Sequence, residues 1–394
     1  MKILMLCDLY SHTLQYQENF LSKYYVKQGH QVTIIASTFD SIFSYMADKY
    51  DREVVASENI IDGIKIIKLP YSLNILNKLR KFGGVDKILD AEKPDVIFAH
   101  NIHLNLKEAK EYKKKNPNTK VIMDYHADYS NSANNWFSLN ILHKVIRKLF
   151  LYRVIKYIDQ IYPVVPASAS FLHEVYGVPY ERMEVLPLGA DTDVAYETKM
   201  HHKGQIVREK LHILATDYVI FTGGKLDAVK KTHLLIKAFI LLSDPHLHLI
   251  VVGEPLGKDA TYKAELEKMC QENRQIYFTG WLSGKEVYDY MDASDFAVFP
   301  ASQSILWQQA IGMGLPLIVG QLKDQSVKYL NKNENMIVID EDSITVDVIA
   351  EKIKMLIVAP TLLKTMKISA LKTSEEFLSY NKIVQRTLMF DKKS

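Results

Sequence analysis

The chain has 394 residues, of which 48% are hydrophobic and 24% charged, a composition typical of a globular protein with substantial cores. Its net charge of +3 gives no indication of nucleic-acid binding, and domains of about 100–200 residues make two domains the natural expectation for this length. The two cysteines, Cys7 and Cys270, lie far apart, which argues against a disulfide framework or a zinc site and favours a reducing compartment.

The apolar run that follows Lys2 is only five residues long, which is too short for the core of a secretion signal. The sequence also lacks the run of about 18 apolar residues that a membrane-spanning helix needs. We therefore expect a cytoplasmic protein that is at most attached to the inner face of the cell membrane.

Short apolar runs alternate with longer amphipathic stretches in the first half of the chain. The predicted strands are Ile3–Cys7, Val32–Ala36, Ile64–Leu69, Val96–Ala99, Val121–Tyr125 and Gln160–Val165. Predicted helices at Glu18–Gln28 and Leu106–Lys115 lie between them. This alternation predicts a parallel, doubly wound α/β sheet.

The same alternation begins again after about residue 187. The strands predicted there are Tyr218–Thr222, Leu247–Val252, Ile276–Phe278, Phe296–Phe299, Leu317–Val319 and Met336–Ile339. A last helix is predicted at about Thr373–Thr387. Such domains bind ligands at the carboxyl ends of their strands. The pattern alone leaves two unrelated α/β domains open as an alternative.

The sharpest motif follows the first strand of the second half, where Gly223 and Gly224 precede Lys225 and, five residues later, Lys230. Glycines let the backbone approach a ligand closely, and two lysines can neutralise a diphosphate and stabilise its charge as it leaves. The alternative is an ordinary turn with solvated lysines.

A second motif occupies Phe299–Pro316. A strand ends at Pro300, and Ser302 or Ser304 is a suitable N-cap for a helix that continues to about Met313. The amides of such a helix start bind anions, and Gln308, one turn on, can bond a ribose hydroxyl. Ordinary packing, with the serine acting only as a cap, is the alternative.

A third motif lies at the end of a strand in the first half. His126 and Asp128 follow that strand, and His100 with Asn101 closes the preceding one in the same way. In a loop at the ligand-binding edge these side chains can contact sugar hydroxyls or orient an acceptor. The alternative is a surface loop.

Several segments, taken together and in this order, resemble the GT-B glycosyltransferases, specifically the large retaining group called family 4. The resemblance rests on residues 29–35 (GHQVTII), 93–100 (KPDVIFAH), 185–191 (VLPLGAD) and 224–230, where Lys225 replaces the usual arginine. It spans nearly the whole chain and implies an α/β protein with two Rossmann-like domains facing across a cleft. The implied parts are an acceptor-side domain (1–186), a donor-binding domain (187–372) and a helix crossing back to the first domain (373–394).

The resemblance also implies roles for these residues. Lys225 and Lys230 hold the donor diphosphate, and His126 approaches the donor sugar, so these three are the candidate catalytic residues. The other predicted donor-binding residues are Gly223, Gly224, Ser302, Gln303, Ser304, Ile305 and Gln308. The family implies that the diphosphate departs and the acceptor hydroxyl attacks from the same face. No cofactor and no metal are expected.

The chain departs from the family pattern in two places. A family subgroup reads FPGTHSxLWEQ, whereas this chain has Ala301, Gln303 and Gln308 in place of the glycine, the histidine and the glutamate. Glutamine lacks the charge that roughly doubles the strength of a hydrogen bond, so we expect weaker donor binding. The first domain lacks the usual Gly-Gly loop and has Gln15, Tyr16 and Gln17 near that place. We assign Tyr16 and Gln17, with His100 and Asp128, to the acceptor side.

The segment Ile141–Phe150 places Lys144, Arg147 and Lys148 on one helical face and apolar residues (Leu142, Val145, Ile146 and Leu149) on the opposite one. A second basic cluster comprises Lys78, Arg80 and Lys81. Such a helix can rest on anionic lipid, or its apolar face can pack on its own sheet. Because related enzymes often act on lipid-linked or polymer acceptors, we keep peripheral membrane contact through residues 141–150 as a hypothesis.

The predicted function is transfer of a sugar from a nucleotide-diphosphate donor, with UDP favoured over GDP, to a glycan, lipid-linked or polymer acceptor. A non-catalytic GT-B protein that binds a partner enzyme or a glycan is the alternative, which Gln303 and Gln308 motivate. A GT-B epimerase or phosphorylase is a third reading.

Overall fold

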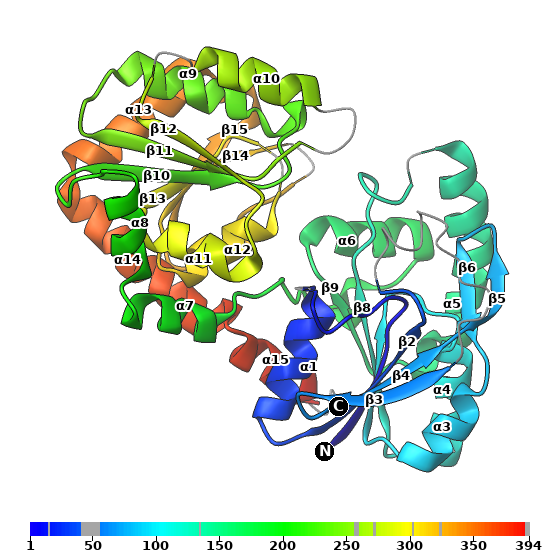
Figure 1. Cartoon of the computed structure of the whole chain (residues 1–394). Coiled ribbons are helices and arrows are strands. Elements are labelled where there is room, and N and C mark those ends of the chain that lie inside the picture. The colour runs from blue at the N-terminus through cyan, green and yellow to red at the C-terminus, as the bar shows by residue number, and fades with distance from the viewer. Residues whose placement is uncertain are drawn as a thin grey trace. The chain divides into compact units, whose positions relative to one another are not determined.

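The computed structural model describes residues 1–14, 16–40, 56–133, 135–255, 260–270, 273–301, 303–322 and 325–390. The chain divides into two compact units (Figure 1). Unit 1 comprises Met1–Pro187 together with Ile383–Ser394, and unit 2 comprises Leu188–Lys382. Each unit is described by itself below.

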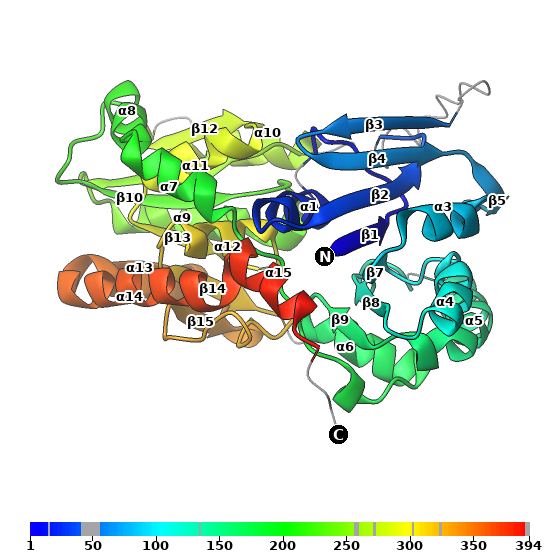
Figure 2. The same ribbon diagram turned by 90° about the horizontal axis from the view of Figure 1, so that it is seen from below.

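Unit 1 is built on a seven-stranded sheet in the order β3-β4-β2-β1-β7-β8-β9, parallel throughout except for β3, which lies antiparallel at the edge (Figure 2). The strands are β1 (Lys2–Leu6), β2 (Gln31–Ser37), β3 (Ser57–Ile61), β4 (Ile64–Leu69), β7 (Val96–His100), β8 (Lys120–Tyr125) and β9 (Gln160–Pro163). A separate antiparallel hairpin is formed by β5 (Tyr71–Ile75) and β6 (Leu79–Phe82).

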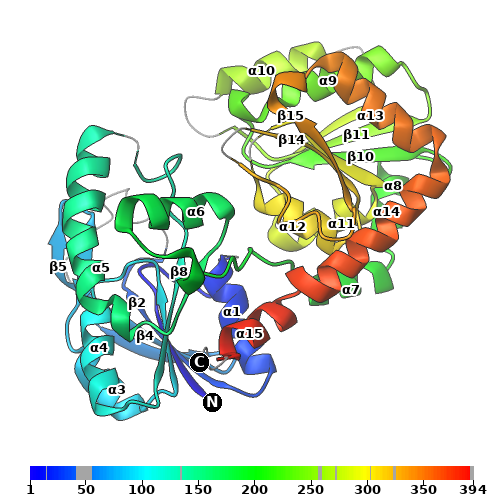
Figure 3. The same cartoon turned by 180° about the vertical axis from the view of Figure 1, so that it is seen from behind.

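Helices cover both faces of this sheet, with α3, α4 and α5 on one side and α1 and α15 on the other (Figure 3). Their bounds are α1 (Gln17–Lys27), α3 (Val85–Glu92), α4 (Leu106–Lys115), α5 (Lys148–Val154), α6 (Pro166–Phe171) and α15 (Tyr380–Leu388). The described part of the unit also contains two π-helical segments, η1 (Ser138–Arg147) and η3 (Leu172–Tyr176), and two short 3-10 turns, Ile155–Tyr157 and Tyr180–Arg182.

Unit 2 has a six-stranded, fully parallel sheet in the order β12-β11-β10-β13-β14-β15. The strands are β10 (Tyr218–Gly223), β11 (Leu247–Val252), β12 (Ile276–Gly280), β13 (Phe296–Phe299), β14 (Leu317–Gln321) and β15 (Met336–Asp340). This strand order is that of a Rossmann domain, and the direction in which successive strands are added reverses between β10 and β13.

Two apolar layers lie on the two faces of this second sheet, one beneath α9, α10 and α13 and the other beneath α8, α11 and α12. The helices are α7 (Thr192–Met200), α8 (Lys203–Lys210), α9 (Thr232–Leu242), α10 (Ala260–Met269), α11 (Gly284–Asp292), α12 (Ile305–Gly312), α13 (Val346–Val358) and α14 (Pro360–Thr373). Shorter turns are 3-10 at Ala228–Lys230 and Glu341–Ser343, and π-helical at Ser374–Leu378.

All twelve predicted strands are present, and two Rossmann-like domains confirm the predicted fold class. The sequence patterns missed β3 and β5, whose side chains are mostly exposed, and β6, a four-residue strand in which only Phe82 is buried, so none of the three carries a buried apolar run.

The continuous helix predicted at Thr373–Thr387 is wrong. The chain is helical through α14, passes through a π turn, and breaks at Ser379 (ψ 135°) before α15. Only the end of this region, from Ile383, groups with unit 1. There the Thr387 and Tyr25 hydroxyls share a hydrogen bond of 2.5 Å, and Arg386 pairs with Glu184.

Among the residues that the structure describes, none of the helices combines the length and apolar character needed to cross a membrane.

Candidate active site

In unit 2, the backbone at the carboxyl end of β10 packs directly on that of β11. The Gly224 amide donates to the Val252 carbonyl at 2.9 Å. A Cβ at Gly223 would lie 2.5 Å from the Val252 carbonyl oxygen, and one at Gly253 would lie 2.0 Å from the Gly224 oxygen. Gly224 and Gly253 both have φ near +117°, which L side chains rarely adopt. Because these residues are glycines, no side chain of their own covers the backbone at the end of β10, where the strand order of the sheet reverses.

The side chain of Lys230 lies over this bare backbone. A Cβ placed on Gly224 would lie 3.4 Å from both the Lys230 Cε and the Ser304 Oγ, so the three groups converge. The Lys230 ammonium donates to the Gln303 carbonyl at 3.4 Å. Burial lowers the pKa of Lys230, the nearby Asp227 carboxylate opposes this, and Lys225 lowers it further. An anion bound at this point would favour the charged form of Lys230 and so offset both its burial and its repulsion by Lys225.

Lys225 is less enclosed than Lys230. Its side chain is 41% exposed, and its ammonium lies 3.7 Å from the Asp227 carboxylate. Asp227 also accepts a hydrogen bond from the Lys230 amide at 3.2 Å, which starts the short 3-10 turn carrying that lysine. Asp227 therefore connects the two lysines, and sequence reasoning had not singled it out.

Helix α12 begins beside Lys230. Ser304 is its N-cap, as predicted, and accepts a hydrogen bond from the Leu306 amide at 3.4 Å. Gln303 donates its backbone amide to the Gln325 side chain at 3.0 Å. Ile305 is the first residue of the helix. Ser302, the other predicted cap and donor-binding residue, lies outside the described residues.

Gln308 lies one turn into α12, where the sequence placed it, but its side chain is turned into the protein and is only 4% exposed. In the side-chain orientation that gives both the amide oxygen and the amide nitrogen of Gln308 a suitable partner, the nitrogen donates to the carbonyls of Ser304 (3.0 Å) and Ile305 (3.2 Å). The other end faces the Tyr329 hydroxyl at 3.5 Å. Contact with a ribose hydroxyl stays a prediction for this residue.

In unit 1, polar groups gather where β7 and β8 end. The His100 Nδ1 and the His126 Nε2 each lie 3.1 Å from the same carboxylate oxygen of Asp124. The Asn101 amide donates to the other oxygen of Asp124 at 2.9 Å, and the Asn101 side chain accepts from the His126 amide at 2.9 Å. Asp124 and Asn101 therefore join the two predicted histidines in one closed network.

The charges in this network are interdependent. Burial alone would lower the pKa of His100, but the carboxylates of Asp124, Glu18 and Asp8 outweigh it and raise that pKa to about 9. Burial alone would raise the pKa of Asp124, but His100 and His126 hold it well below its usual range. Asp124 is therefore ionised and His100 is cationic at neutral pH.

The acceptor-side residues differ in how far their side chains are already engaged. The Asp128 carboxylate accepts three hydrogen bonds within its own turn, from the Ser130 amide and hydroxyl and the Asn131 amide. Tyr16 caps α1 and is 39% exposed. Gln17 is 5% exposed, and within the described part of the chain neither end of its amide has a partner. Gln15 lies outside the described residues.

His100, Asp124 and His126 also offer three ligand atoms within 4.8 Å of one another, a spacing that a metal ion could bridge. Metal ligation by histidine requires a free lone pair, whereas an ionised carboxylate only accepts hydrogen bonds. Both facing ring nitrogens must therefore carry protons as the network stands. The expectation of a metal-free protein stays a prediction.

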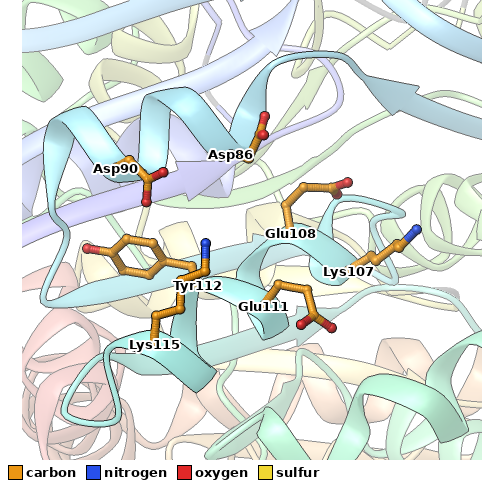
Figure 4. Close-up of a pocket in the computed structure, with 7 residues that line it drawn as sticks. All are labelled: Asp86, Asp90, Lys107, Glu108, Glu111, Tyr112 and Lys115. Carbon is orange, nitrogen blue, oxygen red and sulfur yellow. The ribbon is translucent and has the colours of Figure 1, made fainter.

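A shallow pocket lies elsewhere in unit 1, between α3 and α4 (Figure 4). Its lining is Asp86, Asp90, Lys107, Glu108, Glu111, Tyr112 and Lys115. Two of its four carboxylates are already paired, Glu108 with Lys81 and Glu111 with Lys114. This acidic surface is unsuited to a diphosphate, and it does not lie at the carboxyl edge of the sheet.

Sequence reasoning found both histidines, both lysines and Asn101, but it assigned no role to Asp124, Asp227 or Gly253. Asp124 was read only as the end of a strand, although a carboxylate two residues before His126 was visible in the sequence. Asn101 has φ +60°, an unusual conformation that asparagine tolerates better than most residues. Gly253 directly follows β11 as Gly224 follows β10, and that repetition was an available signal.

Two family models match the chain in succession. The model described as Glycosyltransferase Family 4 matches residues 20–194, and that described as Glycosyl transferases group 1 matches residues 216–358. Together the two ranges take in most of the chain.

Curated and structural relatives agree with these matches. A lipopolysaccharide 1,2-N-acetylglucosaminetransferase of Salmonella typhimurium is 23% identical over 59% of this chain, and the alignment covers 53% of that enzyme, about half its length. Anabaena Alr3699/HepE in complex with UDP superposes with a TM-score of 0.67 at 16% identity over 98% of both chains. A glycosyltransferase of Rickettsia africae gives 0.69 at 15% identity over 100% of this chain and 99% of that one.

Proposed function

Because the chain is a glycosyltransferase of the GT-B, family-4 type, we propose that it transfers a sugar from a UDP-sugar to a glycan, lipid-linked or polymer acceptor, with retention of configuration. The observation that carries the proposal is the convergence of Lys230, the Gly224 backbone and the start of α12 at the switch point of the second sheet. A cation, bare backbone and a helix N-terminus together suit a diphosphate.

In the proposed reaction, Lys230 and Lys225 stabilise the charge that grows on the diphosphate as its bond to the sugar breaks. The acceptor hydroxyl attacks the same face of the sugar, and its proton passes to the departing phosphate oxygen. His126 contacts the donor sugar, while Tyr16, Gln17, His100 and Asp128 lie on the acceptor side. The buried amide of Gln17, for which the described residues supply no hydrogen-bond partner, supports a polar ligand there, because such groups normally find a partner.

Nucleotide binding tests the proposal directly. Calorimetric titration with UDP and GDP, followed by assays for release of sugar from a panel of UDP-sugars, is expected to show UDP binding and slow donor hydrolysis. Thermal shift ranks the sugars, because a ligand of the folded state raises the melting temperature. Failure to bind any nucleotide at millimolar concentration would favour the non-catalytic alternative.

We further propose that unit 1 rests on anionic lipid through an apolar stripe on η1, α5 and the turn before them. Its side chains are 41–81% exposed, and they are Trp136, Phe137, Ile141, Val145, Leu149 and Tyr152. The exposure of Val145, Ile146 and Leu149, with Leu142 half-buried, supports this proposal over the alternative in which the apolar face packs on its own sheet.

The β5–β6 hairpin extends this surface. Leu73, Ile75 and Leu76 are 40%, 46% and 87% exposed. Arg147 of η1 donates to the Lys78 carbonyl at the hairpin turn (3.1 Å), which ties the two elements together. Apolar side chains bordered by Lys144 and Lys148 match the interface of an anionic bilayer.

Vesicle co-sedimentation tests this surface. The protein is expected to bind vesicles that contain phosphatidylglycerol and to dissociate as salt rises. The double variant Ile141→Ser/Leu149→Ser should lose binding, whereas Ile206→Ser, at a 54% exposed position on α8, should retain it. Equal binding by both variants would exclude the stripe as the contact.

A further inference from the structure

Asp124 is almost completely buried, with a side chain 1% exposed, yet its carboxylate is the centre of the network at the ends of β7 and β8. One oxygen faces both His100 and His126, and the other accepts the Asn101 amide. An ionised carboxylate can only accept hydrogen bonds. The ring nitrogen that each histidine turns toward Asp124 must therefore be an N–H.

This requirement determines the tautomer of His126. With its proton on Nε2, a neutral imidazole has its lone pair on Nδ1. Among the described residues, no hydrogen-bond partner is found for that Nδ1, and the side chain is 27% exposed. The Nδ1 atom is therefore available to accept a hydrogen bond from a ligand hydroxyl.

Asn101 fixes the histidine backbone in the same network. Its side-chain oxygen accepts the His126 amide, while its own amide donates to Asp124. The left-handed backbone of Asn101, with φ +60°, is uncommon for a residue other than glycine. The backbone of His126 is thus held by Asn101, at the end of β7, and its ring by Asp124, at the end of β8.

We propose that Asp124 is a positioning residue that, with Asn101, holds His126 in the Nε2–H tautomer so that Nδ1 accepts a hydrogen bond from a substrate hydroxyl. His100, the second ring on the same oxygen, neutralises the buried carboxylate without needing to touch substrate. The proposal rests on the proposed function only for the identity of the hydroxyl, which would belong to a sugar.

Nitrogen NMR of the protein labelled with 15N-histidine tests the tautomer without any activity. The His126 resonances are identified by their loss in His126→Gln. The expected result is a protonated Nε2 and an unprotonated Nδ1, the latter shifted far downfield. A His126 ring protonated on Nδ1, whether alone or together with Nε2, would overturn the proposal even if the enzyme were fully active.

The variant Asp124→Asn tests the proposal through enzyme activity. Its amide can donate to the His126 ring, which drives the proton to Nδ1 and turns the acceptor into a donor. We expect kcat/KM with a UDP-sugar to fall roughly 10- to 100-fold, the cost of a hydrogen bond made by a charged group. UDP alone should bind unchanged, because the diphosphate site is in unit 2.

The chain offers a matched control in unit 2. Asp217 is 6% exposed and bonds His246 (2.9 Å) and His248 (3.1 Å), but it precedes β10 at the opposite edge of that sheet from Gly223. Asp217→Asn should lower the melting temperature about as much as Asp124→Asn does. Unlike Asp124→Asn, it should leave kcat/KM and the His126 resonances unchanged. Equal losses of kcat/KM in the two variants would assign Asp124 a purely structural role and overturn the proposal.

A double-mutant cycle separates positioning from folding. If Asp124 acts through His126, then Asp124→Asn adds no further loss of kcat/KM in the His126→Gln background. Asn101→Gly, which tolerates the left-handed backbone and removes the side chain that accepts the His126 amide, should reproduce part of the loss. Additive losses in the cycle would mean that Asp124 acts independently of His126 and would refute the positioning role.

Discussion

The backbones of Gly253 and Gly224 are so closely packed that a Cβ at position 253 would fall 2.0 Å from the Gly224 carbonyl oxygen. Gly253 is also bonded to the neighbouring strand, donating its amide to the Gly280 carbonyl at 2.9 Å. The turn that carries the proposed diphosphate site is therefore shaped by a glycine on the adjacent strand. Its geometry depends on the sheet as a whole.

Gly253→Ala should consequently be severely destabilising. The methyl group meets backbone that cannot move aside, and φ +117° is strained for alanine, so we expect a loss of about 3 kcal/mol in the free energy of unfolding. Gly280→Ala is the control, because its Cβ would meet only the flexible Glu254 side chain at 3.1 Å. There the φ of +72° alone should cost about 1 kcal/mol. Thermal unfolding of both variants measures the difference, and similar values would contradict it.

Lys230→Gln should weaken UDP binding roughly 10- to 100-fold, because a charge-assisted hydrogen bond to phosphate is replaced by a neutral one. Relief of a buried charge should leave the free protein as stable as before or slightly more stable. Lys237→Gln, at an exposed position on α9, is the matched removal of a positive charge. Calorimetric titration compares the two variants, and equal losses of affinity would indicate only a general electrostatic effect.

Gln308→Glu introduces the glutamate of the family pattern, but we expect it to destabilise this protein. A carboxylate cannot donate to the Ser304 and Ile305 carbonyls, which the Gln308 amide now bonds. The buried carboxylate would face these two carbonyl oxygens with no proton to donate, and the loss of its hydrogen bonds there costs about 1–3 kcal/mol. Melting temperatures with and without UDP check this result. A variant more stable than the natural protein would show that the amide bonds contribute little.

Stability around His100 should depend on pH in a defined direction. Its folded-state pKa of about 9 lies above the unfolded value of about 6.5, so its contribution is complete below pH 6.5 and disappears as pH rises through 9. The shift of the His100 pKa corresponds to an effect of about 3 kcal/mol on the free energy of unfolding. Amide exchange of β7 and β8 measures it at pH 7 and pH 10. His100→Gln should remove this pH dependence; an unchanged profile would mean that other groups cause it.

Much of the fold was readable because buried parallel strands are continuous apolar runs that differ sharply from the polar helix faces between them. Strands with few buried side chains, such as β3, β5 and β6, carry no such signal. The break at Ser379 was missed for a related reason. Its neighbours suit a helix, and the break is accompanied by the Ala190 amide bonding to the Leu378 carbonyl, a contact between residues far apart in the sequence.

The sequence by itself determined the α/β alternation, the order of the motifs, and the residue types at the strand ends, because each depends only on neighbouring residues. Tertiary structure alone decided which strand ends lie together. It brought Asp124 between His100 and His126 and turned Gln308 inward to Ser304. Hydrogen bonds between strands depend on register and on backbone angles such as the φ of Asn101, and local sequence does not specify them.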